Sequence, residues 1–204
     1  YLVTDRSVMS AKSLEQAVEQ AIQGGCTVVQ LREKYASSRE FFETAQRVKQ
    51  ITDSYHIPLI INDRTDICLA VNAAGIHIGQ QDLPAKIVRS MVGPDKIIGV
   101  SAATLSEAIQ AEQDGADYLG VGAMFATSTK TNTRPVTIER LTQIKQAVQI
   151  PVVAIGGIQS SNVTTLTDTG IDGIAVVSAI LAQENITHAA EQLKACFTGA
   201  GHEV

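Results

Sequence analysis

Two cations and an amide alternate along residues 30 to 34, directly after a run of apolar residues. Gln30, Arg32 and Lys34 follow the strand-like segment 26–29. Successive side chains of a strand point to opposite faces, so these three share one face if the strand continues to its end. Two cations on one face are costly in an apolar core but suit a pocket for a multiply charged anion. We therefore expect a local anion site here, with Glu33 on the opposite face and outside the catalytic set.

Two carboxylates follow two other apolar runs of the chain. Asp63 comes directly after the run 58–62, and Asp82 comes shortly after the run 75–78. At one pocket mouth they would repel each other unless a cation lay between them, and Mg²⁺ is typically held by one or two carboxylates together with phosphate oxygens. Taken singly, each could instead be the N-cap of the helix that follows. Beside the two cations above, the magnesium site is the stronger interpretation.

Hydroxyls, an ammonium and glycines complete the candidate site. They lie in one long connection and after two later apolar runs. The residues are Thr127, Ser128, Thr129, Lys130, Gly156, Gly157 and Ser178. The connection could be a solvated loop and Ser178 a plain N-cap. Its length favours a lid or a phosphate clamp, and glycines let the backbone approach a phosphate closely.

No nucleophile or general base stands out in the sequence. His77 lies between Ile76 and Ile78, where a structural histidine is a more natural interpretation than a ligand. The inventory of cations, a metal pair and hydroxyls suits the stabilisation of a leaving phosphate.

Eight short β-branched runs, each followed by a helical pattern, must position these residues. The expected strands are 1–4, 27–31, 58–62, 75–78, 96–101, 118–121, 152–155 and 173–177, and the helices include 66–72, 84–91, 105–114, 138–148, 162–169 and 186–197. This alternation predicts a closed parallel (β/α)8 TIM barrel with residues 1–204 as a single domain. A doubly wound open sheet is the alternative, but no G-x-G-x-x-G follows the first strand. In such a barrel the strand ends named above meet at one mouth.

Composition excludes several classes of function. The 204 residues carry 16 Lys and Arg against 21 Asp and Glu, a formal charge of −5, and aromatic residues make up 4%. An acidic chain without a stacking platform is a poor binder of nucleic acid or of an anionic membrane. Cys26, Cys68 and Cys196 are far apart and fit reduced thiols. We expect a cytoplasmic protein with small-molecule partners, and the sequence leaves open whether it forms a homo-oligomer.

The strand ends together resemble those of the thiamine-phosphate synthase family. The motifs stand in the family's order over essentially the whole chain. They are YLVTDR at 1–6, QLREK at 30–34, NDR at 62–64, GIHIGQQD at 75–82, IGVSA at 98–102, TSTK at 127–130, AIGGI at 154–158 and AVVSAI at 175–180. The resemblance implies a transferase that joins 4-amino-2-methyl-5-hydroxymethylpyrimidine diphosphate to 4-methyl-5-(2-hydroxyethyl)thiazole phosphate, or its carboxylated form, and releases diphosphate. It also implies a dissociative reaction with one Mg²⁺ at the site.

The resemblance also implies roles for particular residues. Those around the pyrimidine diphosphate would be Gln30, Leu31, Arg32, Glu33, Lys34, Asn62, Ser101 and Lys130. Those around the thiazole phosphate would be Thr127, Ser128, Thr129, Gly157, Val177 and Ser178. Asp63 and Asp82 would be the metal ligands, and Arg32, Lys34, Ser101 and Lys130 the catalytic residues.

The chain departs from the family pattern at three alanines. Ala103 stands where a histidine is usual, and Ala123 and Ala126 stand where prolines are usual. The missing prolines predict a less stiff loop, since proline restricts the backbone. No predicted ligand is lost.

Three rival functions share the barrel. A thiazole tautomerase paralogue would have no need of Asp82 or of the run ending in Lys130. A sugar-phosphate isomerase or epimerase would need a base pair or a His-rich metal site, which the sequence does not show. A non-catalytic barrel that binds thiamine precursors stays open at this stage.

Overall fold

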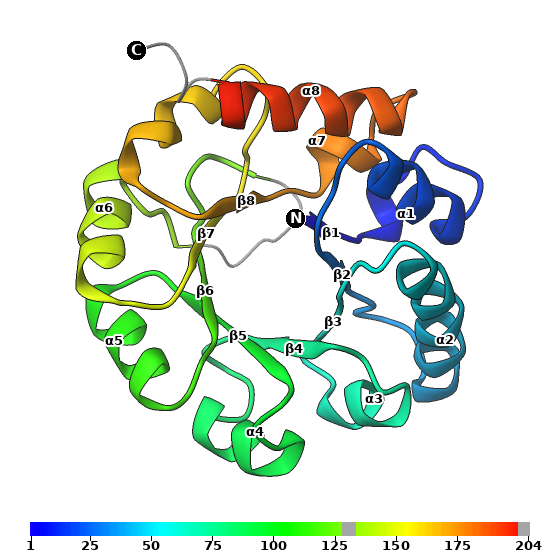
Figure 1. The fold of residues 1–204 in the computed structure, drawn as a ribbon, viewed down its shortest axis with the longest axis horizontal. Helices are drawn as coiled ribbons and strands as arrows, with labels where there is room; N and C mark the ends of the chain where they lie inside the picture. Colours follow the sequence, from blue (N-terminus) through cyan, green and yellow to red (C-terminus); the bar gives the residue numbers. More distant parts are fainter. Residues whose placement is uncertain (128–133, 200–204) are drawn as a thin grey trace.

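Eight parallel strands form one ring, with the helices on its outside (Figure 1). The structure is a computed structural model that describes residues 1–127 and 134–199. The strands are β1 (Leu2–Val3), β2 (Val29–Leu31), β3 (Leu59–Asn62), β4 (Gly75–Ile78), β5 (Ile97–Ala102), β6 (Tyr118–Val121), β7 (Val152–Ile155) and β8 (Gly173–Ala175). They follow one another in chain order, and a parallel bridge between Leu2 and Val176 joins the two ends of the sheet. The predicted (β/α)8 barrel is confirmed.

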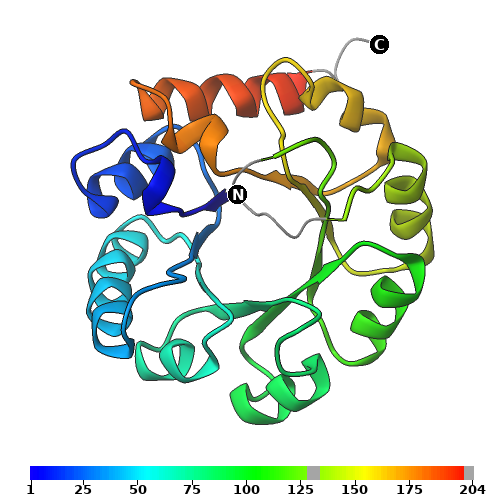
Figure 2. The same cartoon turned by 180° about the vertical axis from the view of Figure 1, so that it is seen from behind.

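The helices cover the outer surface of the ring on all sides, which Figure 2 shows from behind. They are η1 (Arg6–Val8), α1 (Leu14–Gln23), α2 (Ser38–Ser54), α3 (Thr65–Ala70), α4 (Ala85–Val92), α5 (Leu105–Gln113), α6 (Ile138–Ala147), η2 (Val163–Thr169), α7 (Ser178–Leu181) and α8 (Ile186–Gly199). Among the described residues, no helix is long and apolar enough to cross a membrane.

Alternation along the strands separates the packing face from the cavity face. The outward positions are aliphatic and buried, as at Leu31, Ile61 and Ile76, and they belong to the core beneath the helices. The inward positions line a cavity and include polar groups and glycine, as at Gln30 and His77, beside apolar residues such as Val153. The period of two in the strand sequences therefore puts the main hydrophobic core between sheet and helices and brings polar groups into the barrel interior.

Glycine makes room inside the barrel beside the largest inward side chain. Gly99 of β5 lies next to Tyr118 of β6, and a Cβ at position 99 would clash with the phenol ring. The ring of Tyr118 therefore occupies the space that a side chain at residue 99 would otherwise fill. This packing sets the floor of the cavity.

Several elements differ from their sequence prediction: β1 and β8 are shorter than the expected 1–4 and 173–177, and two further differences follow. The expected helix 162–169 is a 3₁₀ helix over Val163–Thr169, in which Thr165, Thr167 and Thr169 donate to carbonyls three residues earlier. Strand β2 covers only Val29–Leu31 and ends before Arg32, whose amide donates to the Thr4 hydroxyl instead of a neighbouring strand. The expectation that one strand aligns Gln30, Arg32 and Lys34 is therefore wrong, although all three reach the cavity.

Candidate active site

A cavity of about 1540 Å³ opens at the carboxyl ends of the strands. Every strand contributes to its lining, directly or through the residues that follow it. Predicted site residues in the lining are Gln30, Arg32, Glu33, Lys34, Asn62, Asp63, Asp82, Ser101, Thr127, Gly157, Val177 and Ser178. The barrel thus gathers into one cavity residues that are up to 148 positions apart, from Gln30 to Ser178. Leu31 is fully buried and does not line the cavity, and Ser128, Thr129 and Lys130 lie outside the described residues.

Glu33 lines the cavity together with its two neighbours, so its predicted place on an opposite strand face is wrong. The reason is the early end of β2 at Leu31, after which the strict alternation of a strand no longer applies. Glu33 accepts from Arg6 at 2.6 Å.

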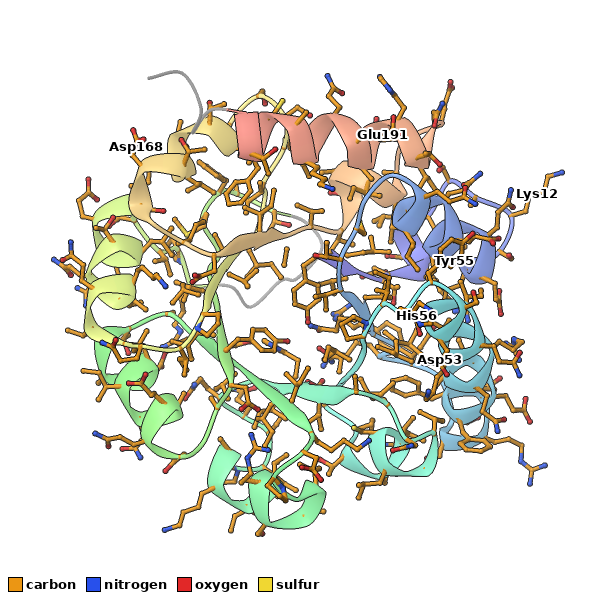
Figure 3. All side chains as sticks on the ribbon, in the orientation of Figure 1. Lys12, Asp53, Tyr55, His56, Asp168 and Glu191 are labelled. Carbon is orange, nitrogen blue, oxygen red and sulfur yellow. The ribbon has the colours of Figure 1, made fainter. Side chains whose placement is uncertain are left out.

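Charges outside the cavity are spread over the outer helices and loops. Figure 3 shows Lys12, Asp168 and Glu191 near the outer edge of the molecule, and the other side chains labelled there, Asp53, Tyr55 and His56, are also exposed. His188 is also exposed on α8, near Glu191, and His202 lies outside the described residues. His56 and His188 are both exposed and lie outside the cavity lining.

Lys34 and two carboxylates meet at the ends of β3 and β4. The Lys34 ammonium donates to Asp63 Oδ2 at 2.5 Å, and the Asp82 carboxylate accepts from the Gly79 amide at 2.7 Å. The pKa of Asp82 is raised, first by burial and then by the adjacent Asp63 carboxylate. The two carboxylates are therefore close enough to interact, with a cation beside them.

Neither aspartate is a helix cap, so both cap interpretations are wrong. The N-cap of α3 is Arg64, and that of α4 is Pro84, each without a side-chain capping bond. Asp63 instead adopts a left-handed backbone with φ 63°, which costs a non-glycine residue free energy. A strained backbone that aims a carboxylate at the cavity is typical of a functional position.

The acid pair fits a hard divalent cation with few protein ligands. Within residues 1–127 and 134–199, no three His, Cys, Asp or Glu side chains cluster closely enough to hold a metal by themselves. A site with two carboxylates needs its remaining ligands from phosphate or water, which is how Mg²⁺ is ordinarily bound. The donor set at Asp63 and Asp82 is therefore compatible with a magnesium ion that arrives with a phosphorylated substrate.

A hydrogen-bonded chain of polar side chains forms the floor of the cavity. Gln30 Nε2 donates to the Tyr1 hydroxyl at 2.6 Å, which lies 2.7 Å from the Tyr118 hydroxyl. Tyr118 lies 2.9 Å from His77 Nδ1, and His77 Nε2 lies 2.9 Å from the Ser101 hydroxyl. Burial raises the pKa of Tyr1 to about 12 and that of Tyr118 well above its usual range, so both phenols keep their protons. The floor thus offers neutral donors and acceptors to a ligand.

Sequence reasoning missed most of this chain of contacts. Tyr1 and Tyr118 fall in predicted strands without a predicted role, and the sequence favours a structural His77. His77 does have satisfied partners, but it also lines the cavity. The signal available in the sequence is the alternation of β4 and β6, which puts His77 and Tyr118 on the inward face together with Ser101.

The ends of β7 and β8 form the opposite side of the cavity. Gly156 and Gly157 have φ of 99° and 65°, and the Phe125 amide donates to the Gly156 carbonyl at 3.0 Å. A Cβ at Gly157 would lie 2.5 Å from the Ala126 carbonyl oxygen, so only glycine fits there. Val177 is the N-cap residue of α7 and Ser178 its first residue; neither is joined by a side-chain capping bond, so the plain N-cap interpretation of Ser178 is wrong.

Ala123, one of the two alanines that stand where the family usually has proline, is held by main-chain hydrogen bonds. The Ala123 amide donates to the Arg134 carbonyl at 3.0 Å, a bond that proline could not make. The Val136 amide donates back to the Ala123 carbonyl at 2.9 Å. This end of the long connection is therefore held by main-chain bonds, which offsets the flexibility expected from the missing proline.

Comparison with known proteins matches the chain to a family. A family model described as thiamine monophosphate synthase covers residues 1–180. A thiamine-phosphate synthase of Ruminiclostridium cellulolyticum is 60% identical over 197 residues, or 97% of this chain and 94% of the relative. This chain belongs to the thiamine monophosphate synthase family. The resemblance seen in the strand-end motifs is thereby confirmed.

Other members of the thiamine monophosphate synthase family agree with this assignment. The Clostridium tetani thiamine-phosphate synthase is 58% identical and covers 97% of this chain and 94% of its own. The solved thiamine phosphate pyrophosphorylase of Pyrococcus furiosus superposes with a TM-score of 0.90 at 39% identity, covering 98% of this chain and 95% of its own. The family is one of transferases, so the prediction of an enzyme of this class is confirmed.

Proposed function

We propose that this protein joins the pyrimidine methyl diphosphate to the thiazole phosphate, giving thiamine phosphate and diphosphate. The observation that carries the proposal is the convergence of Arg32, Lys34, Asp63 and Asp82 at one side of a single large cavity, opposite the glycine turn at Gly157. Family membership supplies the reaction, and this arrangement supplies separate places for a diphosphate and a monophosphate.

Different residues of the chain hold the diphosphate and the ring of the pyrimidine substrate. Arg32 and Lys34 neutralise the diphosphate, and Lys130 is predicted to add a third cation. Gln30, His77 and Ser101 on the polar floor orient the pyrimidine ring through hydrogen bonds. A magnesium ion bound by Asp63 and Asp82 would draw negative charge from the departing diphosphate.

The reaction follows from charge stabilisation without a protein nucleophile. The bond between the pyrimidine methylene and the diphosphate oxygen breaks, and the oxygen keeps the electron pair. The thiazole nitrogen then donates its lone pair to the cationic methylene. Preorganised cations aimed at the developing charge supply the acceleration, and one such group is commonly worth about 10²–10³ in rate. Gly157, Val177 and Ser178 hold the thiazole phosphate close to the methylene.

One assay tests the proposed function. The protein is mixed with both substrates and Mg²⁺, with and without a chelator, and thiamine phosphate is measured. We expect product only with metal, and Lys130→Ala to lower kcat severely in a folded protein. Product that forms equally well in chelator would refute the metal assignment. No product under any condition would refute the reaction and favour a tautomerase or a binding protein.

The setting proposed for this reaction is cytoplasmic, with small molecules as partners. The acidic net charge of the chain and the large central cavity support small substrates over nucleic acid or a membrane.

A further inference from the structure

Two ion pairs connect the ends of β1 and β2. The β1 end supplies the acid in one pair and the base in the other. Asp5 accepts from Arg32, and the next residue, Arg6, donates to Glu33. The Asp5 and Arg32 side chains are only 14% and 18% exposed, whereas that of Arg6 is 45% exposed. All four residues line the cavity, but water screens the pair with Arg6 more than the pair between Asp5 and Arg32.

Arg32 is fixed at both ends by consecutive residues of the neighbouring strand end. Its amide donates to the buried Thr4 hydroxyl at 2.9 Å, and its guanidinium Nη1 donates to Asp5 Oδ2 at 2.8 Å. Among the described residues, its side chain makes no further hydrogen bond. Since Arg32 lines the cavity, the remaining donors of its planar fork are left for a ligand.

Asp5 is itself immobilised, so it can act as a rigid support. Its Oδ1 accepts from the Ser7 amide at 3.0 Å and from the Ser7 hydroxyl at 2.6 Å. The two carboxylate oxygens thus act separately, since Oδ1 closes the turn at η1 and Oδ2 orients the guanidinium. A group held in this way can place a donor with little loss of entropy when the ligand binds.

We propose that Asp5 is a positioning residue that sets the orientation and the effective charge of Arg32 for the leaving diphosphate. The inference rests on the proposed function. A guanidinium without its carboxylate would carry more uncompensated positive charge and would bind ground-state diphosphate at least as well. Binding of that kind does not raise kcat, because only interactions that are stronger in the transition state do so. Asp5 therefore serves the step in which charge develops on the leaving oxygen.

The experiment compares Asp5→Asn and Asp5→Ala with Ser7→Ala as a matched control. Ser7→Ala removes only the hydroxyl bond to Oδ1; the Ser7 amide still holds Oδ1, and the bond from Arg32 to Oδ2 is left in place. We expect kcat to fall about tenfold in Asp5→Asn and further in Asp5→Ala, since the first weakens a charge-assisted hydrogen bond and the second removes it. Affinity for inorganic diphosphate with Mg²⁺, measured by calorimetry, should stay equal or become tighter. Ser7→Ala should stay within about twofold of the wild type in kcat.

A double-mutant cycle with Arg32→Gln shows whether Asp5 acts through Arg32. We expect Asp5→Asn to change kcat little once Arg32 is replaced, because the two residues work as one unit. Full additivity, an unchanged kcat in Asp5→Asn, or an equal loss in Ser7→Ala would each overturn the positioning role. Weaker diphosphate binding in Asp5→Asn would also overturn it, because general damage to the site weakens both properties.

The failure of the proposed function gives a different result. A wild-type protein that forms no thiamine phosphate refutes that function, and the same cycle is then measured on the affinity for inorganic diphosphate. Affinity in Asp5→Asn that is equal to or tighter than that of the wild type, with any gain lost once Arg32 is replaced, would keep the positioning role, and weaker affinity would remove it.

Discussion

The Lys34 ammonium lies 2.5 Å from Asp63 Oδ2, so a proposed diphosphate ligand is paired with a proposed metal ligand. The carboxylate that would bind Mg²⁺ already holds a cation, and the cation that would bind diphosphate already holds an anion. Binding of Mg²⁺ alone to Asp63, or of diphosphate alone to Lys34, would break this ion pair. Binding of both together replaces it with two ion pairs.

Replacing Lys34 should therefore affect metal and diphosphate in opposite directions. In Lys34→Gln, Asp63 is free of its competitor, and exposed ion pairs are worth about 0.2–1 kcal/mol, so Mg²⁺ alone should bind up to about fivefold tighter. Diphosphate should bind more weakly because one of its cations is gone. Calorimetry with each ion checks both. Lys49→Gln, which breaks the outer-surface pair with Asp53, is the charge-matched control. Weaker binding of both ions would contradict the exchange.

Glu107 should make stability depend on pH through its contacts at the start of α5. It accepts from the Ala103 amide at 2.8 Å and from Arg134 Nη2 at 2.9 Å. Burial opposes the charge, but these donors outweigh it and lower the pKa of Glu107. A lowered pKa in the folded state means that the unfolded chain binds more protons, so this stabilisation is present above the unfolded pKa and is lost as pH falls through the folded pKa.

Glu107→Gln should consequently be less stable than the wild type near neutral pH, by about 1 kcal/mol. The difference should close in acid, below the ordinary pKa of a glutamate. Denaturant unfolding at a series of pH values checks this, with Glu191→Gln on the exposed face of α8 as the control. A difference that stays constant with pH would contradict the ionic origin.

Removing the Tyr118 hydroxyl should weaken one substrate more than the other. Tyr118→Phe breaks the polar floor between Tyr1 and His77. We expect a higher KM for the pyrimidine diphosphate, an unchanged KM for the thiazole phosphate and a loss of about 1 kcal/mol in stability. Tyr55→Phe, at the peripheral end of α2 (Figure 3), loses a comparable hydroxyl bond to Glu19 and should keep both KM values. An equal rise in both KM values would point to general damage of the cavity.

Gly157 should tolerate no side chain because of the close Ala126 carbonyl. Gly170 is the control, since it has a similar positive φ but no neighbour within 4 Å. Gly157→Ala must accommodate a Cβ 2.5 Å from the Ala126 carbonyl, while Gly170→Ala meets nothing within 4 Å at a similar positive φ of 75°. Both substitutions strain the backbone by about 1 kcal/mol, but only Gly157→Ala distorts the cavity wall. We expect at least a tenfold rise in the KM for thiazole phosphate, about 1.4 kcal/mol, in Gly157→Ala alone. Equal kinetics in the two variants would refute a role for this turn.

Patterns of period two and 3.6 were enough to predict the barrel and most of its helices. The buried face of α1 follows its periodicity residue by residue, from Leu14 to Ile22. The failures occur where side chains bond to the main chain. Residues 163–169 form a 3₁₀ helix in which three threonines donate to main-chain carbonyls, and the Thr4 hydroxyl accepts from the Arg32 amide just beyond the end of β2. Such competition depends on contacts that periodicity does not record.

The sequence predicted the charged residues of the candidate site better than its aromatic polar residues. Arg32, Lys34, Asp63 and Asp82 stand out because charges after apolar runs are unusual, and all four line the cavity. Tyr1, Tyr118 and His77 do not stand out, because aromatic residues are ordinary in strands. Only the three-dimensional register, which brings β1, β4 and β6 around one axis, shows that their polar atoms form a continuous chain.

Gly99 and Tyr118 also constrain how this barrel can change in evolution. The ring of Tyr118 fills the space over Gly99, so a larger residue at 99 is accepted only after the ring at 118 has been lost. Loss of the ring, in turn, removes the hydroxyl between Tyr1 and His77. A lineage that altered this wall would have to pass through an intermediate with an interrupted floor. The two positions are therefore expected to vary together, and a new ring specificity would require paired substitutions.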